Sequence, residues 1–260
     1  MKKLVLIILC AVMVFSSCIT KTYAETSYSW YTVKKGHDTP IFPPQADFVE
    51  NHNGYFIDKK ADENDEKIIY LTFDAGYENG NIEKILDILK DEEVKGAFFI
   101  LQNLINKNPE LVKRISDEGH ILCNHTKNHK DMTTLTESEM IANLKFLEDL
   151  CEEKTGCRMA KYFRFPEGRY NEEVLTTAEN NGYSTFFWSL TYADWDNAKQ
   201  IDSNVAIKKL LDNLHSGAII LLHPTSATNV KILGDFIRAA KDEGYSFSTL
   251  DKLIERNKCK

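Results

Sequence analysis

Five stretches of the sequence carry a chemically capable polar side chain at the end of an apolar run. The polar residues are, in chain order, Asp74, His125 with His129, Arg164, Asp194 and His223. A carboxylate and an imidazole can exchange protons with a substrate, and a pair of imidazoles can bind a divalent metal. A guanidinium can hold a carboxylate in its charged form. Together these side chains suit the hydrolysis of an amide.

The motif HTKNH places His125 and His129 four residues apart. If the chain turns helically after the preceding strand, both imidazoles face one way and can share a divalent metal, which polarises the carbonyl and its water. An H-x-x-x-H pair alone is weak evidence, because two loop histidines also occur by chance. The position after the apolar segment HILCN favours the metal site.

The acid and the base of this hydrolysis come from other segments. Asp74 follows a run of residues that should be buried, and we expect it to take the proton from the attacking water, although it could instead cap a helix. Arg164 ends another buried run and needs an anion, for which Asp74 is the obvious candidate. His223 is either a satisfied core histidine or the donor of a proton to the departing amine. In the second case Asp194 would raise the pKa of His223 and fix its tautomer.

From residue 66 onward, short apolar runs alternate with stretches of helical period, as in KIIYLTF followed by NIEKILDILKDEEV, which Asn81 is placed to cap. We count six such units and a weaker seventh, which predicts a parallel sheet wrapped by helices in an α/β fold. An open sheet gathers its ligands at one switch point, whereas a (β/α) barrel collects residues from many strand ends around one pocket. Five contributing strand ends favour the barrel, and six or seven units make it incomplete.

The start of the chain does not belong to this pattern. Residues 1–24 have a basic start, an apolar run and a small residue at their end, which predicts a secretory signal peptide and a secreted protein. A lipoprotein box that lipidates Cys18 is the less favoured alternative. Residues 25–65 are polar and irregular, and we expect an N-terminal extension that packs on the surface of a catalytic domain spanning 66–255. The formal net charge of −7 argues against a nucleic-acid partner.

The cysteines leave one question open. Cys151 and Cys157 could pair in an oxidising compartment if the chain turns between them, or Cys151 could simply be the buried end of a helix. Cys123 lies inside an apolar run and is expected in the core.

The segments TFDAG, HTKNH, RFPEG, ADW and LLH, in this order, resemble the polysaccharide deacetylases of carbohydrate esterase family 4. The resemblance covers roughly residues 66–252. It implies a distorted (β/α) barrel of seven to eight units and the metal-assisted removal of acetyl groups from N-acetylated sugars. It also implies the same roles that the chemistry of the polar residues suggests. Asp74 is the base, and Arg164 positions it. His125 and His129 bind the metal, and His223 is the acid with Asp194 as its partner.

One position departs from the family pattern. The family reads T-F-D-D, and its second Asp completes the metal triad, whereas this chain has Ala75. The longer string TFDAGYENGN is similar to one subgroup, the delta-lactam-forming N-acetylmuramic acid deacetylases of spore-forming bacteria. The resemblance therefore implies a divalent metal that binds weakly or is dispensable, and zinc is the first candidate. It implies as substrate the peptide-free glycan strands of peptidoglycan, deacetylated before lactam closure in spore cortex.

Residues expected to line the glycan pocket are Asn79, Asn81, Glu167, Arg169, Tyr170 and Trp195. Arg169 is the candidate for the lactyl carboxylate of muramic acid. The alternatives are a deacetylase of N-acetylglucosamine in wall glycan or chitin oligomers, and a glycan-binding relative without turnover. A zinc peptidase is disfavoured, because the sequence has no H-E-x-x-H motif.

Overall fold

The computed structural model describes residues 26–258, and a parallel nine-stranded sheet forms its centre. The order is β11-β12-β5-β6-β7-β8-β10-β4, and β13 pairs with the first half of β5. The strands are β4 (Gly54–Tyr55), β5 (Ile68–Ala75), β6 (Gly96–Ile100), β7 (Ile121–Asn124), β8 (Tyr162–Phe163), β10 (Ser184–Phe186), β11 (Leu190–Thr191), β12 (Ile219–Leu222) and β13 (Ser246–Ser248). Because all these pairings are parallel, every carboxyl end lies at the same side of the sheet.

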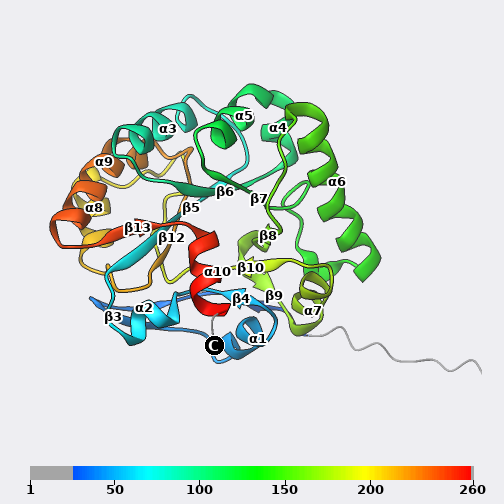
Figure 1. Cartoon of the computed structure of the whole chain (residues 1–260), viewed down its shortest axis with the longest axis horizontal. Coiled ribbons are helices and arrows are strands. Elements are labelled where there is room, and N and C mark those ends of the chain that lie inside the picture. The colour runs from blue at the N-terminus through cyan, green and yellow to red at the C-terminus, as the bar shows by residue number, and fades with distance from the viewer. Residues whose placement is uncertain (1–25, 259–260) are drawn as a thin grey trace, which may run out of the picture.

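The sheet curls until its two ends nearly meet. Phe187 still donates its backbone N–H to Tyr55 of β4, whereas Ser189 donates to Ile219 of β12, at the opposite end of the strand order. Two residues of extended chain span at most about 7 Å, so the ends of the sheet must lie close together. The distorted, incomplete barrel expected from the sequence is confirmed, and Figure 1 shows helices around its outside.

The helices of the βα units follow the strands along the chain. They are α3 (Ile82–Asp91), α4 (Gln102–Lys107), α5 (Pro109–Asp117), α6 (Glu137–Thr155), α7 (Glu172–Asn180), α8 (Ser203–Leu211), α9 (Ala227–Asp242) and α10 (Leu250–Lys258), with 3-10 turns η1 (Met132–Thr134) and η2 (Pro166–Gly168). Asn81 stands at the N-cap of α3, but its side chain does not cap the helix. Glu78 does so instead, because its carboxylate accepts the backbone N–H of Ile82 at 3.0 Å.

Strand β5 shows how the sequence delivers Asp74 to the inside of the barrel. Side chains alternate along a strand. Leu71, Phe73 and Ala75 point outward and join the large core cluster that includes residues of α3 and α9. Tyr70 belongs to the inner cluster, which also contains the buried Cys123 expected in the core. Asp74 has the same parity as Tyr70, so it points into the barrel at the carboxyl end of the strand.

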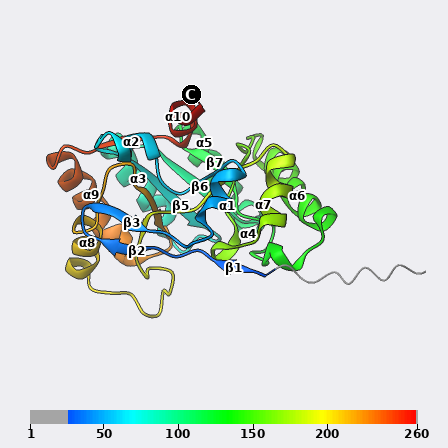
Figure 2. The ribbon, with the colours of Figure 1, turned by 90° about the horizontal axis from the view of Figure 1, so that it is seen from below.

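The N-terminal residues are more deeply built into the fold than expected. Strand β4 is an edge strand of the main sheet and pairs in parallel with β10. Trp30 is 5% exposed and packs in an aromatic cluster with Phe56 and Phe187. The remaining elements of this segment are β1 (Tyr28–Ser29), which pairs with β9 (Arg169–Tyr170), the hairpin of β2 (Val33–Lys35) and β3 (Asp38–Ile41), α1 (Ala46–Asn51) and α2 (Lys59–Glu63). Figure 2 shows β1, β2 and β3 running along one side of the molecule.

Some expectations fall on residues beyond this description. The signal peptide of residues 1–24 and the lipidation of Cys18 lie outside the described residues. Within residues 26–258, no helix is both long and apolar enough to cross a lipid bilayer.

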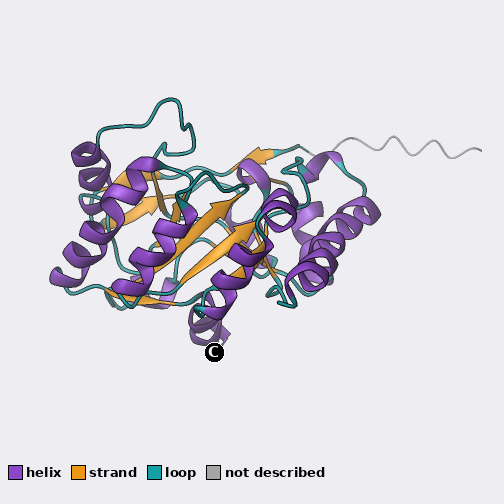
Figure 3. Cartoon of the chain, turned by 90° about the horizontal axis from the view of Figure 1, so that it is seen from above, coloured by secondary structure: helices purple, strands orange, loops and turns teal. Residues whose placement is uncertain are grey.

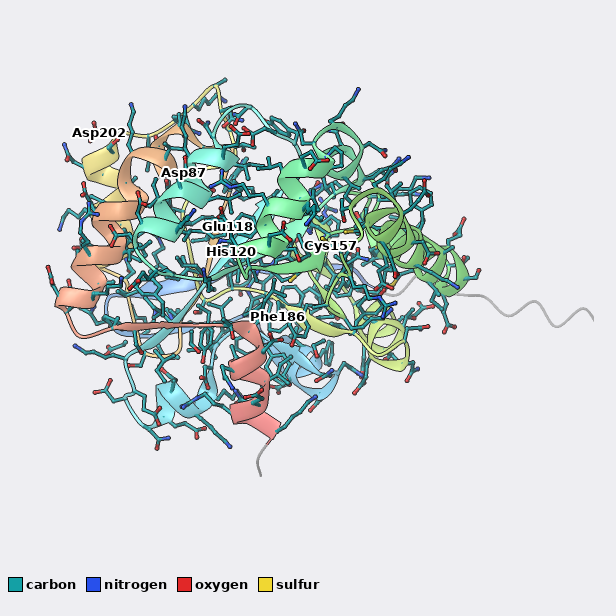
Figure 4. The ribbon with its side chains drawn as sticks, turned by 45° about the horizontal axis from the view of Figure 1, so that its top comes forward. Asp87, Glu118, His120, Cys157, Phe186 and Asp202 are labelled. Carbon is teal, nitrogen blue, oxygen red and sulfur yellow. The ribbon has the colours of Figure 1, made fainter. Side chains whose placement is uncertain are left out.

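The disulfide between Cys151 and Cys157 does not form, and both residues are free thiols. Cys151 is the buried residue in the last turns of α6, as the alternative interpretation held. Its sulfur lies 3.7 Å from the hydroxyl of Thr155, which continues the helix before Gly156 ends it with a φ of 70°. Figure 4 labels Cys157, which follows this helix end.

Candidate active site

A cavity of about 640 Å³ opens at the carboxyl ends of the strands. Its lining includes the residues Asp74, His125, His129, Trp195 and His223, all of which the sequence predicted as site residues. Arg164 and Asp194 are almost completely buried and act from behind this lining. The long loop between β11 and α8, which carries Trp195, projects beside the barrel in Figure 3.

Arg164 fixes the carboxylate of Asp74 from inside the barrel. Its Nη1 donates to Asp74 Oδ1 at 2.8 Å, its Nη2 to Thr72 Oγ1 at 2.9 Å, and its Nε to the carbonyl of Phe186 at 3.0 Å. The guanidinium carbon also lies 4.1 Å from the ring centre of Phe99. These contacts hold the planar guanidinium group from several directions. The guanidinium group therefore fixes the orientation of the Asp74 carboxylate before any ligand binds.

Asp74 is held as an anion despite its burial. Burial by itself raises the pKa of this carboxyl, but the neighbouring His125, Arg164 and His223 hold the pKa below its ordinary value of 3.8. Asp74 caps no helix, since α3 is capped by Glu78. An ionised, oriented carboxylate at the cavity wall is the arrangement that a general base needs.

His125 presents a lone pair to the same carboxylate. Its Nδ1 lies 2.9 Å from the carbonyl oxygen of Arg164, and since a carbonyl only accepts, Nδ1 carries the proton. Burial lowers the pKa of His125 to about 4, so the imidazole is neutral and its Nε2 is unprotonated near neutral pH. That Nε2 lies 3.5 Å from Asp74 Oδ2. Two electron-rich atoms face each other there, which favours a cation or a hydrogen-bond donor beside them.

His129 joins His125 by a different backbone route from the one expected. The chain does not turn helically after β7. Thr126 and His129 adopt left-handed conformations with φ of 76° and 57°, and the Thr126 hydroxyl accepts the His129 backbone N–H at 2.9 Å. The two imidazole rings nevertheless lie with their centres 5.0 Å apart. A polar side chain that satisfies the turn has replaced the helical hydrogen bonds.

His125 and His129 are the residues that would hold a divalent metal, because their imidazole rings lie side by side at the cavity. Ala75 supplies nothing, because its methyl group is buried in the outer core. Across residues 26–258, no group of three or more His, Cys, Asp or Glu side chains is arranged to hold a metal. His120, at the other end of β7, is buried and does not line the cavity. Figure 4 labels it beside Glu118.

His223 has the properties of a proton donor. Its Nδ1 donates to Asp194 Oδ1 at 2.7 Å, and its backbone N–H donates to Asp194 Oδ2 at 2.7 Å. Burial lowers the pKa of His223, but the hydrogen bond and the charge of Asp194, with the charge of Asp74, raise it above 6.5. Because Nδ1 is engaged with Asp194, Nε2 is the nitrogen left for a ligand in the cavity.

Asn79 and Asn81 hold the cavity wall together. Both side-chain amides donate to the backbone carbonyl of Thr225, at 2.9 and 2.8 Å. This double contact joins the loop after β5 to the loop after β12, which carries His223. Neither asparagine lines the cavity, so the structure assigns them to the wall's support and not to its surface.

The other predicted glycan contacts divide into three groups. Glu167 and Trp195 line the cavity, and the Trp195 ring lies 6.3 Å from the ring of His223. Arg169 is half-exposed at the rim, where its guanidinium binds Glu167 at 2.9 Å and Asp131 at 3.6 Å. Tyr170 is fully buried against Trp30 and Phe187, so its prediction as a glycan contact is wrong. Because Tyr170 follows Arg169 on β9, its side chain faces inward while that of Arg169 faces outward.

Sequence reasoning missed several residues of the site. Thr72 binds Arg164 and precedes Asp74 by two positions, so the strand period could have indicated it. Trp188 also lines the cavity, two residues after the end of β10, and its apolar neighbours in the sequence give no sign of this. Tyr77 lines the cavity at its mouth, and its hydroxyl accepts a hydrogen bond of 2.6 Å from Asn197. No spacing signal points to Tyr77, because its partner comes from a distant loop.

The fold and the site define a class of protein. A carboxylate with a lowered pKa and an imidazole with a raised pKa face one cavity at the carboxyl ends of a parallel barrel, as in hydrolases that split an acyl bond by acid–base catalysis. The comparisons make the class more specific. The polysaccharide deacetylase model matches residues 61–186, and the chain belongs to the polysaccharide deacetylase family.

The relatives cover nearly the whole chain. The chain is 37% identical over 217 residues to the peptidoglycan-N-acetylmuramic acid deacetylase PdaA of Bacillus subtilis, covering 82% of this chain and 81% of PdaA. The solved structure of Bacillus subtilis PdaA, a family 4 carbohydrate esterase, is similar with a TM-score of 0.83 at 35% identity, over 89% of this chain and 98% of that one. A family 4 carbohydrate esterase from Bacillus anthracis has a TM-score of 0.72 at 32% identity, over 88% and 97%. Deacetylases of this family are in general metal-dependent.

Proposed function

We propose that this protein removes the N-acetyl group from N-acetylmuramic acid in the glycan strands of peptidoglycan. One observation carries the proposal: two titratable groups on the same cavity have pKa values pushed in opposite directions. The pKa of Asp74 lies below its ordinary value, and that of His223 lies above its own. Such a pair assigns the base and the acid of a hydrolysis.

Asp74 acts first, as the general base. Arg164 holds the carboxylate toward the cavity, so that a water molecule beside the substrate carbonyl can give up its proton to Asp74 as it attacks. Because the guanidinium is fully buried and binds four protein groups, it stays in place through the reaction.

His223 acts second, as the general acid. Its Nε2–H faces the cavity while Nδ1 is engaged with Asp194. Protonation of the amide nitrogen by His223 lets the C–N bond break, so that the sugar leaves as a neutral amine and the acetyl group leaves as acetate, which contains the oxygen of the attacking water. Asp194 stabilises the imidazolium before the proton leaves.

His125 and His129 would hold a divalent metal, with zinc as the first candidate, and His125 would bind it through its unprotonated Nε2. When bound, this ion supplies Lewis-acid polarisation of the amide carbonyl. With two imidazoles and no carboxylate at position 75, binding is weaker than in a site with three protein ligands. The buried, neutral state of His125 prepares it for this role.

The choice of sugar rests on the relatives and on the string TFDAGYENGN. The chain is similar to PdaA over most of its length, and PdaA is a peptidoglycan-N-acetylmuramic acid deacetylase. We propose further that the reaction takes place on peptide-free glycan outside the cytoplasmic membrane, where it would prepare the muramic delta-lactam of spore cortex; the signal-like sequence of residues 1–24 and the string TFDAGYENGN support this. The second candidate is the deacetylation of N-acetylglucosamine, because a peptidoglycan-N-acetylglucosamine deacetylase of Bacillus cereus is 32% identical over 74% of this chain.

A substrate comparison tests the proposal. The protein is incubated with peptide-free peptidoglycan strands and with chitin oligomers, and the released acetate and free amine are measured, with the deacetylated sugar identified after hydrolysis. Free amine on muramic acid is the expected result. Free amine on glucosamine alone would move the assignment to the second candidate, and no release from either glycan would leave a binding protein without turnover.

A further inference from the structure

The carboxylate of Asp194 is also held from the side of α9. Asn229, in the first turn of that helix, donates from Nδ2 to Asp194 Oδ2 at 2.6 Å and to the backbone carbonyl of His223 at 2.9 Å. Its side-chain oxygen accepts a hydrogen bond from the hydroxyl of Tyr192. Asn229 is fully buried and Tyr192 is 4% exposed. Neither side chain lines the cavity, so neither meets a substrate there.

Tyr192 determines which face of the amide meets the carboxylate. An asparagine side chain offers an oxygen on one side and an NH₂ group on the other. The Tyr192 hydroxyl donates to the oxygen, which leaves the NH₂ group facing Asp194. Without this hydroxyl, the amide could rotate and place its oxygen against the carboxylate, where two acceptors repel each other.

Asn229 also shares the negative charge of Asp194. Asp194 Oδ1 accepts from His223 Nδ1, while Oδ2 accepts from the His223 backbone N–H and from Asn229. Each donor stabilises the anion and makes it a weaker partner for the imidazolium. We propose that Asn229 and Tyr192 are positioning residues for His223, which orient Asp194 and moderate its charge so that His223 both holds and releases its proton. This inference rests on the proposed role of His223 as the acid.

The effect can be isolated from the other groups around His223. The charged groups that face it are Asp194 on the loop after β11, Asp74 on β5 and Arg164 after β8. A substitution at Asn229 by an uncharged residue removes a donor from Asp194 but changes the charge of none of these groups. The Asp194 backbone is anchored separately, because Gln200 donates to its carbonyl at 3.1 Å. A variant without Asn229 still offers Asp194 the two nitrogen donors of His223.

The test is an NMR titration of the His223 ring in the whole protein and in the variants Asn229→Leu and Tyr192→Phe. The His223→Gln spectrum identifies the signal. We expect the titration of His223 to move upward by roughly half a pH unit in Asn229→Leu, and in the same direction but less in Tyr192→Phe. In turnover assays, kcat should fall about tenfold in Asn229→Leu while KM changes less than about twofold.

Tyr245→Phe is the matched control. Its hydroxyl is buried to a similar degree and donates to the Leu214 carbonyl at 3.2 Å, away from the cavity, so the His223 titration should not move. A His223 titration that is unchanged or lowered in both folded variants would overturn the inference. The titration needs no substrate. If no glycan is deacetylated, the proposed function fails while the positioning role is still decided by the NMR result.

Discussion

The guanidinium of Arg164 crosses the inside of the barrel to bind Asp74, with Nη1 2.8 Å from Oδ1. Asp74 belongs to β5 and Arg164 directly follows β8, and β6 and β7 lie between these strands in the sheet. The arginine side chain is fully buried and that of Asp74 is 10% exposed. The pair therefore links the packing of the barrel interior to the charge of the proposed base.

Loss of Arg164 should destabilise the protein in a pH-dependent way. Arg164→Met leaves Asp74 as a buried charge without its partner, and we expect the free energy of unfolding near pH 7 to fall by about 3–5 kcal/mol. In the wild type the pKa of Asp74 is lowered, so its stabilising effect is present above 3.8 and is lost as pH falls through the folded-state pKa. The difference between the two proteins should thus narrow in acid. Urea unfolding at a series of pH values measures it.

Arg238→Met serves as the control for this comparison. Arg238 is 56% exposed and pairs with Glu92 and Asp235 on the surface, so its loss should leave the unfolding free energy nearly unchanged. Equal stability of Arg164→Met and the wild type near neutral pH would show that the buried pair does not hold the barrel.

The activity should follow a bell-shaped pH profile with identifiable limbs. Activity needs Asp74 ionised and His223 protonated. The pKa of Asp74 lies below 3.8 and that of His223 lies above 6.5. The rate should therefore be high between pH 3.8 and 6.5, and fall as the pH drops below the pKa of Asp74 or rises above the pKa of His223. The measurement is kcat/KM for acetate release across the pH range. His223→Gln should remove the alkaline limb and lower the rate about 10²- to 10⁴-fold. An alkaline limb that persists in this variant would assign it to another group.

Metal binding should depend on the two loop histidines. We expect zinc to bind the protein at one site, measured by calorimetry, and His129→Ala to abolish this binding because a single imidazole remains. His52→Ala is the matched control, since His52 lies beside two carboxylates, Glu172 and Glu179, on another face. Zinc binding that survives in His129→Ala but disappears in His52→Ala would place the metal elsewhere.

Arg169 should affect the affinity for muramic acid more than the rate. At the rim its guanidinium is shared between Glu167 and Asp131, and the lactyl carboxylate of a peptide-free muramic acid would compete for it. Arg169→Ala should raise KM for the muramic substrate about tenfold and leave kcat unchanged, a loss at the lower end for a charge-assisted hydrogen bond. An unchanged KM would refute this role for Arg169.

Sequence patterns located the site because the buried strands are short apolar runs that end in one polar residue. Asp74 and His223 follow such runs directly, and parallel strands bring their carboxyl ends to one side. The backbone between His125 and His129 was not predictable, because Thr126 closes the turn with its own hydroxyl in a left-handed conformation.

Other details depend on contacts between distant segments. Asn79 was expected to touch the glycan, but it binds the Thr225 carbonyl, which comes from a loop 146 positions later in the chain. Residues before β5 lack any apolar period, yet Trp30 and strand β4 are integral to the fold, because isolated aromatic residues fill gaps that the barrel leaves. Cys151 lies within helix α6, which continues to Thr155. The chain therefore does not turn directly after Cys151, and its thiol is free.

The central claim is that one carboxylate, Asp74, activates the water that attacks the acetamide. The most direct measurement is acetate release from peptide-free peptidoglycan strands by the wild type, Asp74→Asn and Asp196→Asn. Asp196 is a control carboxylate, 42% exposed, on the neighbouring loop. We predict a loss in kcat of about 10²- to 10⁴-fold for Asp74→Asn and none for Asp196→Asn. A folded Asp74→Asn protein with wild-type turnover would contradict the account.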